Sequence, residues 1–497
     1  MRLTRLPRRL ALLLALSAAA PAAAQRRPQQ DAASAPKAAP KSSPSSAKAA
    51  DAIRIPFERM TLPNGLTVLL APDHSTPQVT VDVWYHVGSK NEVPGRTGFA
   101  HMFEHVMFTG SGHIPYGVHD RLTGGVGGSN NGQTTEDRTN YYENVPANYL
   151  ETALWLEADR MGFLLDKLDS AKFAAQRDIV QNERRQGIDN QPYGRAGEIL
   201  TAATFPETHP YSWSVVGYMA DLQRATVEDV KSFFRLYYAP SNATMSIVGD
   251  FEPAQAKAWV TKYFGPLPRG KAIARPAVAT PTLTSERRLV FEDRVQVPRL
   301  YVQWPTVGAK DDDVYALRFL GQLLTSSRTA RLTKALVYDR QAATSVRAAQ
   351  DALERAGTFG IVATPRPGHP LAELEAVTDT VIDRLKRDGP TPDEMARAGA
   401  GLEFAFVSSL ESSLGKAEIL NQGAVFHGDP AYFRTQYARL RAVTAADVQR
   451  VAARYLGPNR VVLSVVPLGK SDQASNAAVS TRVTVSPDGG HYIMESK

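Results

Sequence analysis

The segment from Gly98 to Ser111, GFAHMFEHVMFTGS, places three ionisable side chains among apolar ones. If the segment is helical, His101 and His105 project about 40° apart and lie one turn apart, because each residue turns the helix by about 100°. Two imidazoles at this spacing can share one zinc ion. Glu104 would lie beside them, where a carboxylate can take a proton from a water molecule activated by the metal. The spacing therefore predicts a zinc site with a general base.

The other positions of this segment are apolar on every side of the helix: Phe99, Met102, Phe103, Val106, Met107 and Phe108. Such a helix is expected to be buried, and three unpaired ionisable groups inside a protein are costly. The alternative is that the histidines are core or surface residues bonded to the backbone. Metal coordination offsets the cost for all three groups at once, so we favour it. The order H-x-x-E-H also inverts the zinc motif H-E-x-x-H.

A catalytic zinc ion usually has three protein ligands, so a third is needed. The segment DSAKFAAQRDIVQNERRQGIDN predicts a helix that opens at Ser170. Four of its residues recur at heptad spacing and share the inward face: Phe173, Gln176, Val180 and Glu183. Arg184 should point elsewhere. A carboxylate on that face is either the third ligand or one partner of a salt bridge between helices.

Histidines elsewhere in the chain lack ligand spacing. They include His113, His119 and His209, and we expect them to be loop or structural residues.

The elements that must position these residues fall into two similar halves. ATVEDVKSFFRLYYAPSNATMSIVGDF recurs in outline as VTAADVQRVAARYLGPNRVVLSVVPLG, each with a Thr cap, a helix, a proline and a strand. The separation of Asp229 from Asp447 equals that of Pro240 from Pro458, and we call it the repeat offset. Chance similarity is the alternative, but the shared order and spacing favour a duplication. Strands mixed with long amphipathic helices predict an α+β fold of two homologous domains, each a mixed or antiparallel sheet packed with helices.

The chain divides accordingly. Residues 53–265 are the domain with the zinc motif, and residues 287–470 are its homologue. A proline-rich interdomain linker, residues 266–286, joins them, and residues 471–497 are a polar tail that we expect to be loose. Residues 25–52 are rich in Ala, Pro, Ser and Lys, which predicts a disordered linker.

Residues 1–24 have a basic start, an apolar stretch and an Ala22-Ala23-Ala24 ending, as in a cleaved signal peptide. The alternative is a membrane anchor, but the apolar run is shorter than the roughly 20 residues that span a bilayer. We therefore expect no stable membrane insertion after cleavage. Cleavage removes four arginines and lowers the net charge from +7 to +3, too little to indicate a nucleic-acid partner. An exported chain without cysteine suits a bacterial periplasm.

At these motifs the sequence resembles the pitrilysin family of zinc metallopeptidases, over essentially all of residues 53–470. The resemblance implies that His101 and His105 are zinc ligands and that Glu104 is the base. RDIVQNERR resembles the family's third-ligand helix, which implies that Glu183 is the third ligand. The spacing from His105 to Glu183 is slightly longer than the family leads us to expect. The family commonly has a supporting glutamate two helical turns earlier, where this chain has Gln176; the change weakens the charge around the site and removes no ligand.

The segment GGSNNGQTTEDRTNYYENVP resembles the family's edge strand beside the zinc. The resemblance implies that the main chain at Asn131 and Gly132 pairs with an extended peptide substrate. The alternative is an ordinary hairpin rich in Asn and Gly.

The second half lacks H-x-x-E-H, and the resemblance implies an inactive duplicate that closes the cavity and contributes substrate contacts. LLTSSRTARLTKALVYDRQAATSV resembles a further family region. Thr344 stands there where the family usually has a tyrosine, so we assign no catalytic role to Arg328, Arg331 or Tyr338.

The resemblance implies a periplasmic zinc endopeptidase that cleaves unfolded peptides. Family members with a complete clamshell have four such domains and this chain has two. We therefore expect half of a clamshell, which forms a homodimer or a heterodimer with a related non-catalytic chain. The alternative function is a non-catalytic family member that acts as a partner, a scaffold or a peptide-binding subunit. The intact set of His101, Glu104 and His105 favours the enzyme.

Overall fold

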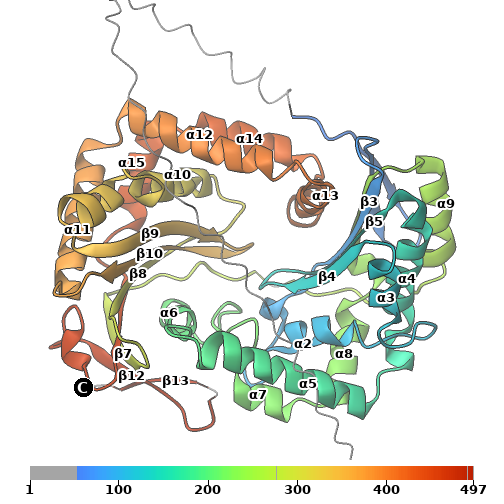
Figure 1. Cartoon of the computed structure of the whole chain (residues 1–497), viewed down its shortest axis with the longest axis horizontal. Helices are drawn as coiled ribbons and strands as arrows, with labels where there is room; N and C mark the ends of the chain where they lie inside the picture. Colours follow the sequence, from blue (N-terminus) through green and yellow to red (C-terminus); the bar gives the residue numbers. More distant parts are fainter. Residues whose placement is uncertain (1–52, 276, 490, 496–497) are drawn as a thin grey trace, which may run out of the picture. The chain divides into compact units, whose positions relative to one another are not determined.

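The computed structural model describes residues 53–275, 277–489 and 491–495. The predicted signal peptide and disordered linker, residues 1–52, lie outside these ranges. The first half forms a six-stranded sheet in the order β1-β2-β6-β3-β5-β4. Figure 1 labels its strands β3, β5 and β4. Its strands are β1 (Glu58–Thr61), β2 (Thr67–Pro72), β3 (Gln78–Tyr85), β4 (Ser129–Thr134), β5 (Thr139–Pro146) and β6 (Ala243–Gly249). β2 and β6 are parallel and the other neighbours are antiparallel, which leaves β4 at an edge.

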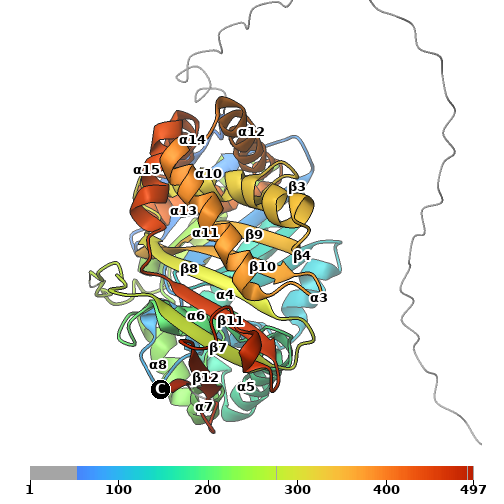
Figure 2. The same cartoon turned by 90° about the vertical axis from the view of Figure 1, so that its left-hand side faces the viewer.

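The second half forms a seven-stranded sheet in the order β13-β12-β7-β11-β8-β10-β9 (Figure 2). Its strands are β7 (Arg287–Asp293), β8 (Arg299–Val307), β9 (Ala343–Ala352), β10 (Ala356–Pro365), β11 (Val461–Pro467), β12 (Thr481–Val485) and β13 (Tyr492–Glu495). The neighbouring strands β7-β11-β8-β10-β9 of this sheet lie in the same order as β2-β6-β3-β5-β4 of the first sheet. β6 and β11 are related by the repeat offset at both of their ends. The predicted α+β fold of two homologous domains is confirmed.

Helices of the first half are α2 (Phe99–Val106), α3 (Val118–Gly124), α4 (Leu150–Phe163), α5 (Ser170–Arg184), α6 (Ala196–Thr204), α7 (Met219–Arg224), α8 (Val227–Tyr237) and α9 (Pro253–Phe264). Those of the second half are α10 (Asp313–Thr325), α11 (Leu371–Asp388), α12 (Pro392–Ser408), α13 (Ser413–Gln422), α14 (Tyr432–Ala442) and α15 (Ala445–Tyr455). The predicted Thr caps are present: Thr226 and Thr444 accept hydrogen bonds from the third residues of α8 and α15. These matching helices of the two halves thus begin in the same way.

Each half also lends one helix to the sheet of the other half. α6 of the first half packs on β8 and β11 of the second, where Ile199 joins Val461 and Leu463 in one core. Because side chains alternate along a strand, Val462 and Val466 face the opposite core, which contains α11 and α15. The second sheet is therefore covered on one face by its own helices and on the other by α6 (Figure 1).

The reciprocal helix is α13, which packs on β3 and β6 of the first half (Figure 1). Leu420 joins Leu69 and Val248 in an apolar core. The side chain of Asn421, fully buried, accepts a hydrogen bond from Ser246 (2.7 Å) and donates one to Asp82 (3.0 Å). The repeat offset relates α6 closely to α13, so the exchange is a symmetric product of the duplication.

A buried polar cluster adds a second link between the halves. Nζ of Lys90 donates to Oε2 of Glu354 in the second half (2.5 Å) and to Oδ1 of Asp137 in the first (2.8 Å). His86 also contacts Glu354, at 2.9 Å. All four side chains are largely buried, so the halves are linked here by ion pairs shielded from solvent.

Residues 266–275 and 277–286 contain neither helix nor strand. The expectation of a loose tail after Lys470 is wrong where the tail forms β12 and β13. β12 pairs in parallel with β7, and β13 pairs with β12, so the tail extends the second sheet. The polar composition suggested a loose segment, but Val483 on β12 is buried against Phe291, and this contact outweighs the composition. Within the described ranges, no helix combines the length and the apolar character needed to cross a membrane.

Candidate metal centre

The helix α2 carries the predicted motif, and its start is held tightly. Gly98 precedes it with φ of 85°, a left-handed conformation that favours glycine. The buried carboxylate of Glu92 accepts hydrogen bonds from the backbone N–H groups of Gly98 (2.9 Å) and Ala100 (2.7 Å). It thereby satisfies amide groups that the first turn of a helix leaves without partners.

The apolar positions of α2 face the core as predicted. Phe99, Met102, Phe103, Val106 and Met107 are buried. His101, Glu104 and His105 are only partly buried, and they form one polar stripe. The apolar positions thus fix the orientation of the helix, and the stripe faces a neighbouring helix and strand, α5 and β4.

The helix α5 brings Glu183 to this stripe. The side chains of Phe173, Gln176 and Val180 are buried as expected from the heptad spacing. Glu183, in the last turn, is 45% exposed and not buried, although it follows the same heptad spacing. Arg184, which we expected to point elsewhere, is the deeply buried residue of this turn, at 1% exposure.

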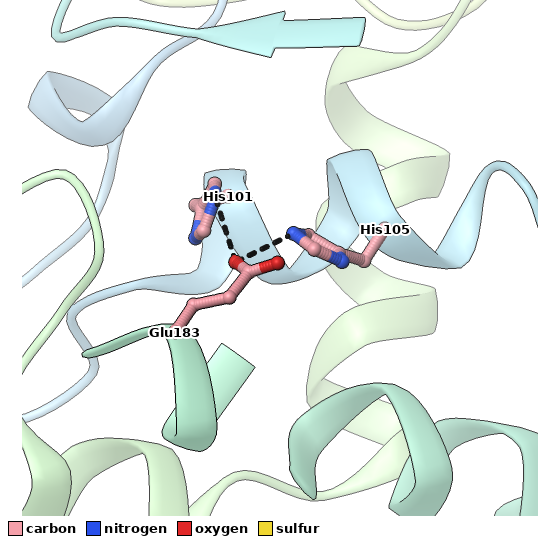
Figure 3. A group of neighbouring side chains, drawn as sticks. All are labelled: His101, His105 and Glu183. Carbon is pink, nitrogen blue, oxygen red and sulfur yellow. Dashed lines mark ion pairs between the residues drawn. The ribbon is translucent and has the colours of Figure 1, made fainter. Parts of the chain in front are cut away.

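The structure brings His101, His105 and Glu183 together, as Figure 3 shows. Oε2 of Glu183 lies 3.7 Å from Nε2 of His101 and 3.1 Å from Nε2 of His105. Two atoms that each lie about 2.1 Å from a tetrahedral zinc ion are about 3.4 Å apart. The observed separations bracket that value, so these two nitrogens and one oxygen fit three ligands of a single zinc ion. They also leave a fourth position for water or substrate.

Burial sets the protonation of the cluster. It lowers the pKa of His101 to about 4, and it also lowers the pKa of His105. Both imidazoles are therefore neutral at pH 7, the form that binds metal. Burial raises the pKa of Glu104 to about 6; the hydrogen bond from Thr134 opposes this rise, and the charge of Glu183 adds to it. A carboxylate with such a pKa can accept and release a proton near neutral pH.

The strand β4 lies beside Glu104 at the edge of the first sheet. A methyl group on Gly132 would lie 3.0 Å from Cγ of Glu104, so the backbone approaches this side chain closely. Asn131 is the preceding residue, and its side-chain oxygen accepts a hydrogen bond from the N–H of Gly132 (2.9 Å). β4 and β5 do form a hairpin, as the alternative held, and β4 is also an edge strand beside the motif.

Sequence reasoning missed Thr134, whose hydroxyl donates to Oε2 of Glu104 at 2.6 Å. Thr134 is two residues beyond Gly132 on the same strand, so both face the motif. The alternation of side chains along a strand is the sequence signal that could have identified Thr134.

The other histidines lie in separate environments. His113 contacts Asp159 at 2.5 Å and is largely exposed. His119 is buried beside Glu143, and Nδ1 of His209 accepts from the N–H of Tyr211 at 3.1 Å.

The second half repeats the arrangement of helices without the polar stripe. At the repeat offset, Phe319, Gln322 and Leu323 stand in α10 where α2 has His101, Glu104 and His105. Gly401 in α12 takes the place of Glu183, and a methyl group there would lie 3.5 Å from Oε1 of Gln322. The packing of the two helices is thus retained, while apolar residues and a glycine replace the three candidate ligands and an amide replaces Glu104.

The second half also contains Arg328, Arg331 and Tyr338, to which we assign no catalytic role on the basis of the sequence. Arg331 pairs with Glu394 (2.7 Å), and Arg328 and Tyr338 are exposed.

Comparison with known proteins agrees with this division. Residues 67–212 match the family model described as Insulinase (Peptidase family M16), and residues 224–402 match the Peptidase M16 inactive domain. The zinc protease PqqE of Helicobacter pylori is 32% identical over 362 residues, which cover 72% of this chain and 80% of that protein. The chain belongs to peptidase family M16. The predicted relation to the pitrilysin family is thereby confirmed.

Other M16 relatives share most of the chain. A crystal structure of a protease from Helicobacter pylori has a TM-score of 0.78 and 30% identity, and covers 83% of this chain and 99% of that one. A probable mitochondrial-processing peptidase subunit beta of Arabidopsis thaliana is 23% identical over 417 residues, or 82% of this chain and 77% of that protein. The M16 fold therefore extends over both halves.

Proposed function

We propose that this M16 protein is a zinc-dependent endopeptidase that hydrolyses unfolded peptides. The observation that carries the proposal is the convergence of His101, His105 and Glu183 within 4.8 Å, beside Glu104. The name of the relative PqqE, a zinc protease, supports the choice of metal and of reaction.

The residues of the chain have distinct roles in this proposal. His101, His105 and Glu183 would hold zinc, which supplies a Lewis acid that polarises the peptide carbonyl and activates water. Glu104 takes the proton from the attacking water and passes it to the leaving amine. The Thr134 hydroxyl orients Oε2 of Glu104 and stabilises its ionised form. The convergence of the three candidate ligand atoms and the hydrogen bond from Thr134 to Glu104 support these roles.

The edge strand β4 is proposed to bind the substrate. An extended peptide can add to the free edge of a sheet through backbone hydrogen bonds, which place little demand on its sequence. Gly132 lies close beside Glu104, so a peptide bonded to the edge at Asn131 and Gly132 would pass the proposed metal centre. An unfolded chain can offer such an extended segment anywhere along its length, and this favours unfolded substrates. Gln176, buried two turns before Glu183, would support the ligands without adding charge.

The alternative is a non-catalytic M16 protein that acts as a partner, a scaffold or a peptide-binding subunit. The M16 inactive domain and the replacement of a supporting glutamate by Gln176 are the observations that favour it. The presence of Glu104 with its hydrogen-bond partner favours the enzyme, because a scaffold has no need of a base.

Zinc content and peptide cleavage of the purified protein test the proposal, together with the variant Glu104→Gln. We expect one zinc ion per chain and cleavage of unstructured peptides that a chelator abolishes. Glu104→Gln should keep the zinc and lose at least about 100-fold in kcat, the usual contribution of a general base. A protein without bound zinc, or a Glu104→Gln variant as fast as the parent, would contradict the mechanism. Zinc binding without cleavage would favour the non-catalytic alternative.

We also propose export to the periplasm with removal of residues 1–24, and a dimer as the working unit. The sequence of residues 1–24 and the two-domain length of the chain support these proposals. N-terminal sequencing of the exported protein and its mass in solution test them. An intact N-terminus contradicts the first, and a fully active monomer contradicts the second.

A further inference from the structure

The last turn of α5 carries Glu183 at an exposed end of the helix. The Glu183 side chain is 45% exposed, so its place beside the histidines depends on how firmly this turn is held. The turn is not continued by regular helix, because Arg185–Asp189 form a π-helical segment. An anchor next to Glu183 is therefore needed to keep the cluster together.

Arg184 is that anchor. Its Nη1 and Nη2 atoms donate to the two carboxylate oxygens of Glu198, at 2.8 and 3.1 Å. Nη1 also donates to the carbonyl oxygen of Gly217 at 2.7 Å. A planar guanidinium that forms two parallel bonds to a carboxylate has little freedom to rotate. The backbone of the last turn of α5 is thus tied to two other segments.

One of these segments leads to the other metal-bearing helix. Gly217 packs against Gly98, the residue before α2, so closely that a methyl group on Gly217 would lie 2.4 Å from the Gly98 Cα. Gly98 begins the helix that carries His101 and His105. Arg184 therefore links the helix with the carboxylate ligand to the start of the helix with both imidazoles.

The other segment leads to the C-terminal end of the chain. Glu198 lies on α6, and it accepts a third hydrogen bond from the hydroxyl of Tyr492 on β13. The Tyr492 ring meets Tyr218 edge-on at 6.5 Å, and the Arg184 guanidinium lies 5.6 Å from the ring of Tyr218. The tail that we expected to be loose thus closes over the Arg184–Glu198 pair.

We propose that Tyr492 is a positioning residue for the metal centre. Its hydroxyl holds the Glu198 carboxylate, Glu198 holds Arg184, and Arg184 holds the turn that presents Glu183. The inference rests on the proposed zinc site. It assigns the C-terminal strand a part in metal binding, although the strand does not touch the metal ligands.

The test uses the full chain and the variants Tyr492→Phe, Glu198→Gln and the double variant. The zinc dissociation constant is measured by competition with a chelator, and the visible spectrum of the cobalt-loaded protein reports the geometry of the ligands. Partners that orient metal ligands typically contribute about 10- to 100-fold in metal affinity. We expect about 10-fold or more for Glu198→Gln and about 3- to 10-fold for Tyr492→Phe, which acts one bond further away. The double variant should be no weaker than Glu198→Gln, because residues that act in series are not additive.

Tyr455→Phe is the matched control. The Tyr455 hydroxyl donates to Oδ2 of Asp313 at 2.7 Å, and that carboxylate also binds Arg454 at 3.0 Å. The control removes a tyrosine hydroxyl from a similar set of tyrosine, carboxylate and arginine in the second half, and zinc affinity should not change. The proposal is overturned if Tyr492→Phe keeps the parent's affinity and cobalt spectrum, or if Tyr455→Phe weakens zinc equally.

These outcomes are distinct from failure of the proposed function. A parent that binds zinc tightly but cleaves no peptide removes the peptidase and leaves the inference on Tyr492 open to the same affinity test. A parent that binds no zinc overturns both.

Discussion

Replacing Thr134 by Val tests how the chain sets the proton affinity of Glu104. The Thr134 hydroxyl donates to Oε2 of Glu104 at 2.6 Å, and valine keeps the shape of the side chain without the donor. This hydrogen bond stabilises the ionised carboxylate, so its loss raises the pKa of Glu104 above the parent's value of about 6. The pKa rises because the acceptor of this hydrogen bond is the negatively charged form of Glu104.

The magnitude follows from the strength of the bond. A hydrogen bond to a charged group contributes about 1.5–3 kcal/mol, and one pKa unit corresponds to about 1.36 kcal/mol. The pKa of Glu104 should therefore rise by about 1 to 2 units. A general base must be unprotonated in the free enzyme, so activity is lost as pH falls through its pKa. The acidic limb of the pH profile of kcat/KM should move to higher pH by the same amount, about 1 to 2 units.

The assay is the pH dependence of peptide cleavage between about pH 5 and 9, with zinc content measured on the same samples. Thr306→Val is a matched control, because Thr306 is a buried strand residue whose hydroxyl bonds to Gln350 in the second half. We expect Thr134→Val to approach parent activity at the alkaline end and to fall well below it near the parent's Glu104 pKa of about 6. An acidic limb that does not move, in a variant with full zinc, would refute the reasoning about Thr134.

Three further predictions concern the metal ligand, the edge strand and the link between the halves. Glu183→Gln should weaken zinc binding by more than about 100-fold, beyond the usual effect of partners that only orient ligands. Asp178→Asn, on the same helix, is the control and should leave zinc affinity unchanged. Competition with a chelator measures both affinities, and equal losses would contradict the assignment of Glu183. Gly132→Ala should lower kcat/KM and keep zinc, because the added methyl group lies 3.0 Å from Cγ of Glu104. Gly360→Ala, at a strand position with open space, is the control. An unchanged kcat/KM in Gly132→Ala would argue against a close approach of the β4 backbone to Glu104. Glu354→Gln should lower the free energy of unfolding by about 2 kcal/mol at pH 7, since it breaks a buried ion pair while Lys90 keeps Asp137. Burial alone would raise the pKa of Glu354, but the hydrogen bond from His86 and the charge of Lys90 hold it well below the ordinary value of 4.5. The stabilisation is therefore present above pH 4.5 and fades as pH falls below it; urea titrations from neutral pH to acid should show parent and variant converging, and a constant gap would count against this ion pair.

The sequence predicted the parts of the site that depend on local geometry. Helical spacing alone placed His101, Glu104 and His105 on one stripe, because the backbone dictates that spacing whatever the helix packs against. Heptad spacing brought Glu183 to the right face of its helix. The repeat offset predicted the duplicated fold, since each copy keeps its own order of caps, helices and strands.

The parts it missed depend on contacts between distant segments. We expected Arg184 only to point away from the face that carries Glu183, and its burial depends on Glu198 and Gly217, which accept hydrogen bonds from its guanidinium. Thr134 reaches Glu104 only because β4 crosses α2, and the strands of the tail form only because the edge at β7 is available to pair. The amino-acid composition of a segment does not indicate which distant segment it will contact, so these contacts could not be predicted without the fold.

The exchange of α6 and α13 between the halves bears on how the chain is made. During synthesis the first half emerges before α13 exists, so the apolar patch around Leu69 and Val248 has no cover until residues 413–422 have left the ribosome. The nascent first half therefore displays an apolar surface prone to aggregation until α13 covers it. The same exchange adds contacts between residues far apart in the sequence, and such contacts slow folding. An M16 chain assembled in this way completes the half that carries the candidate metal centre only when nearly the whole chain has been made.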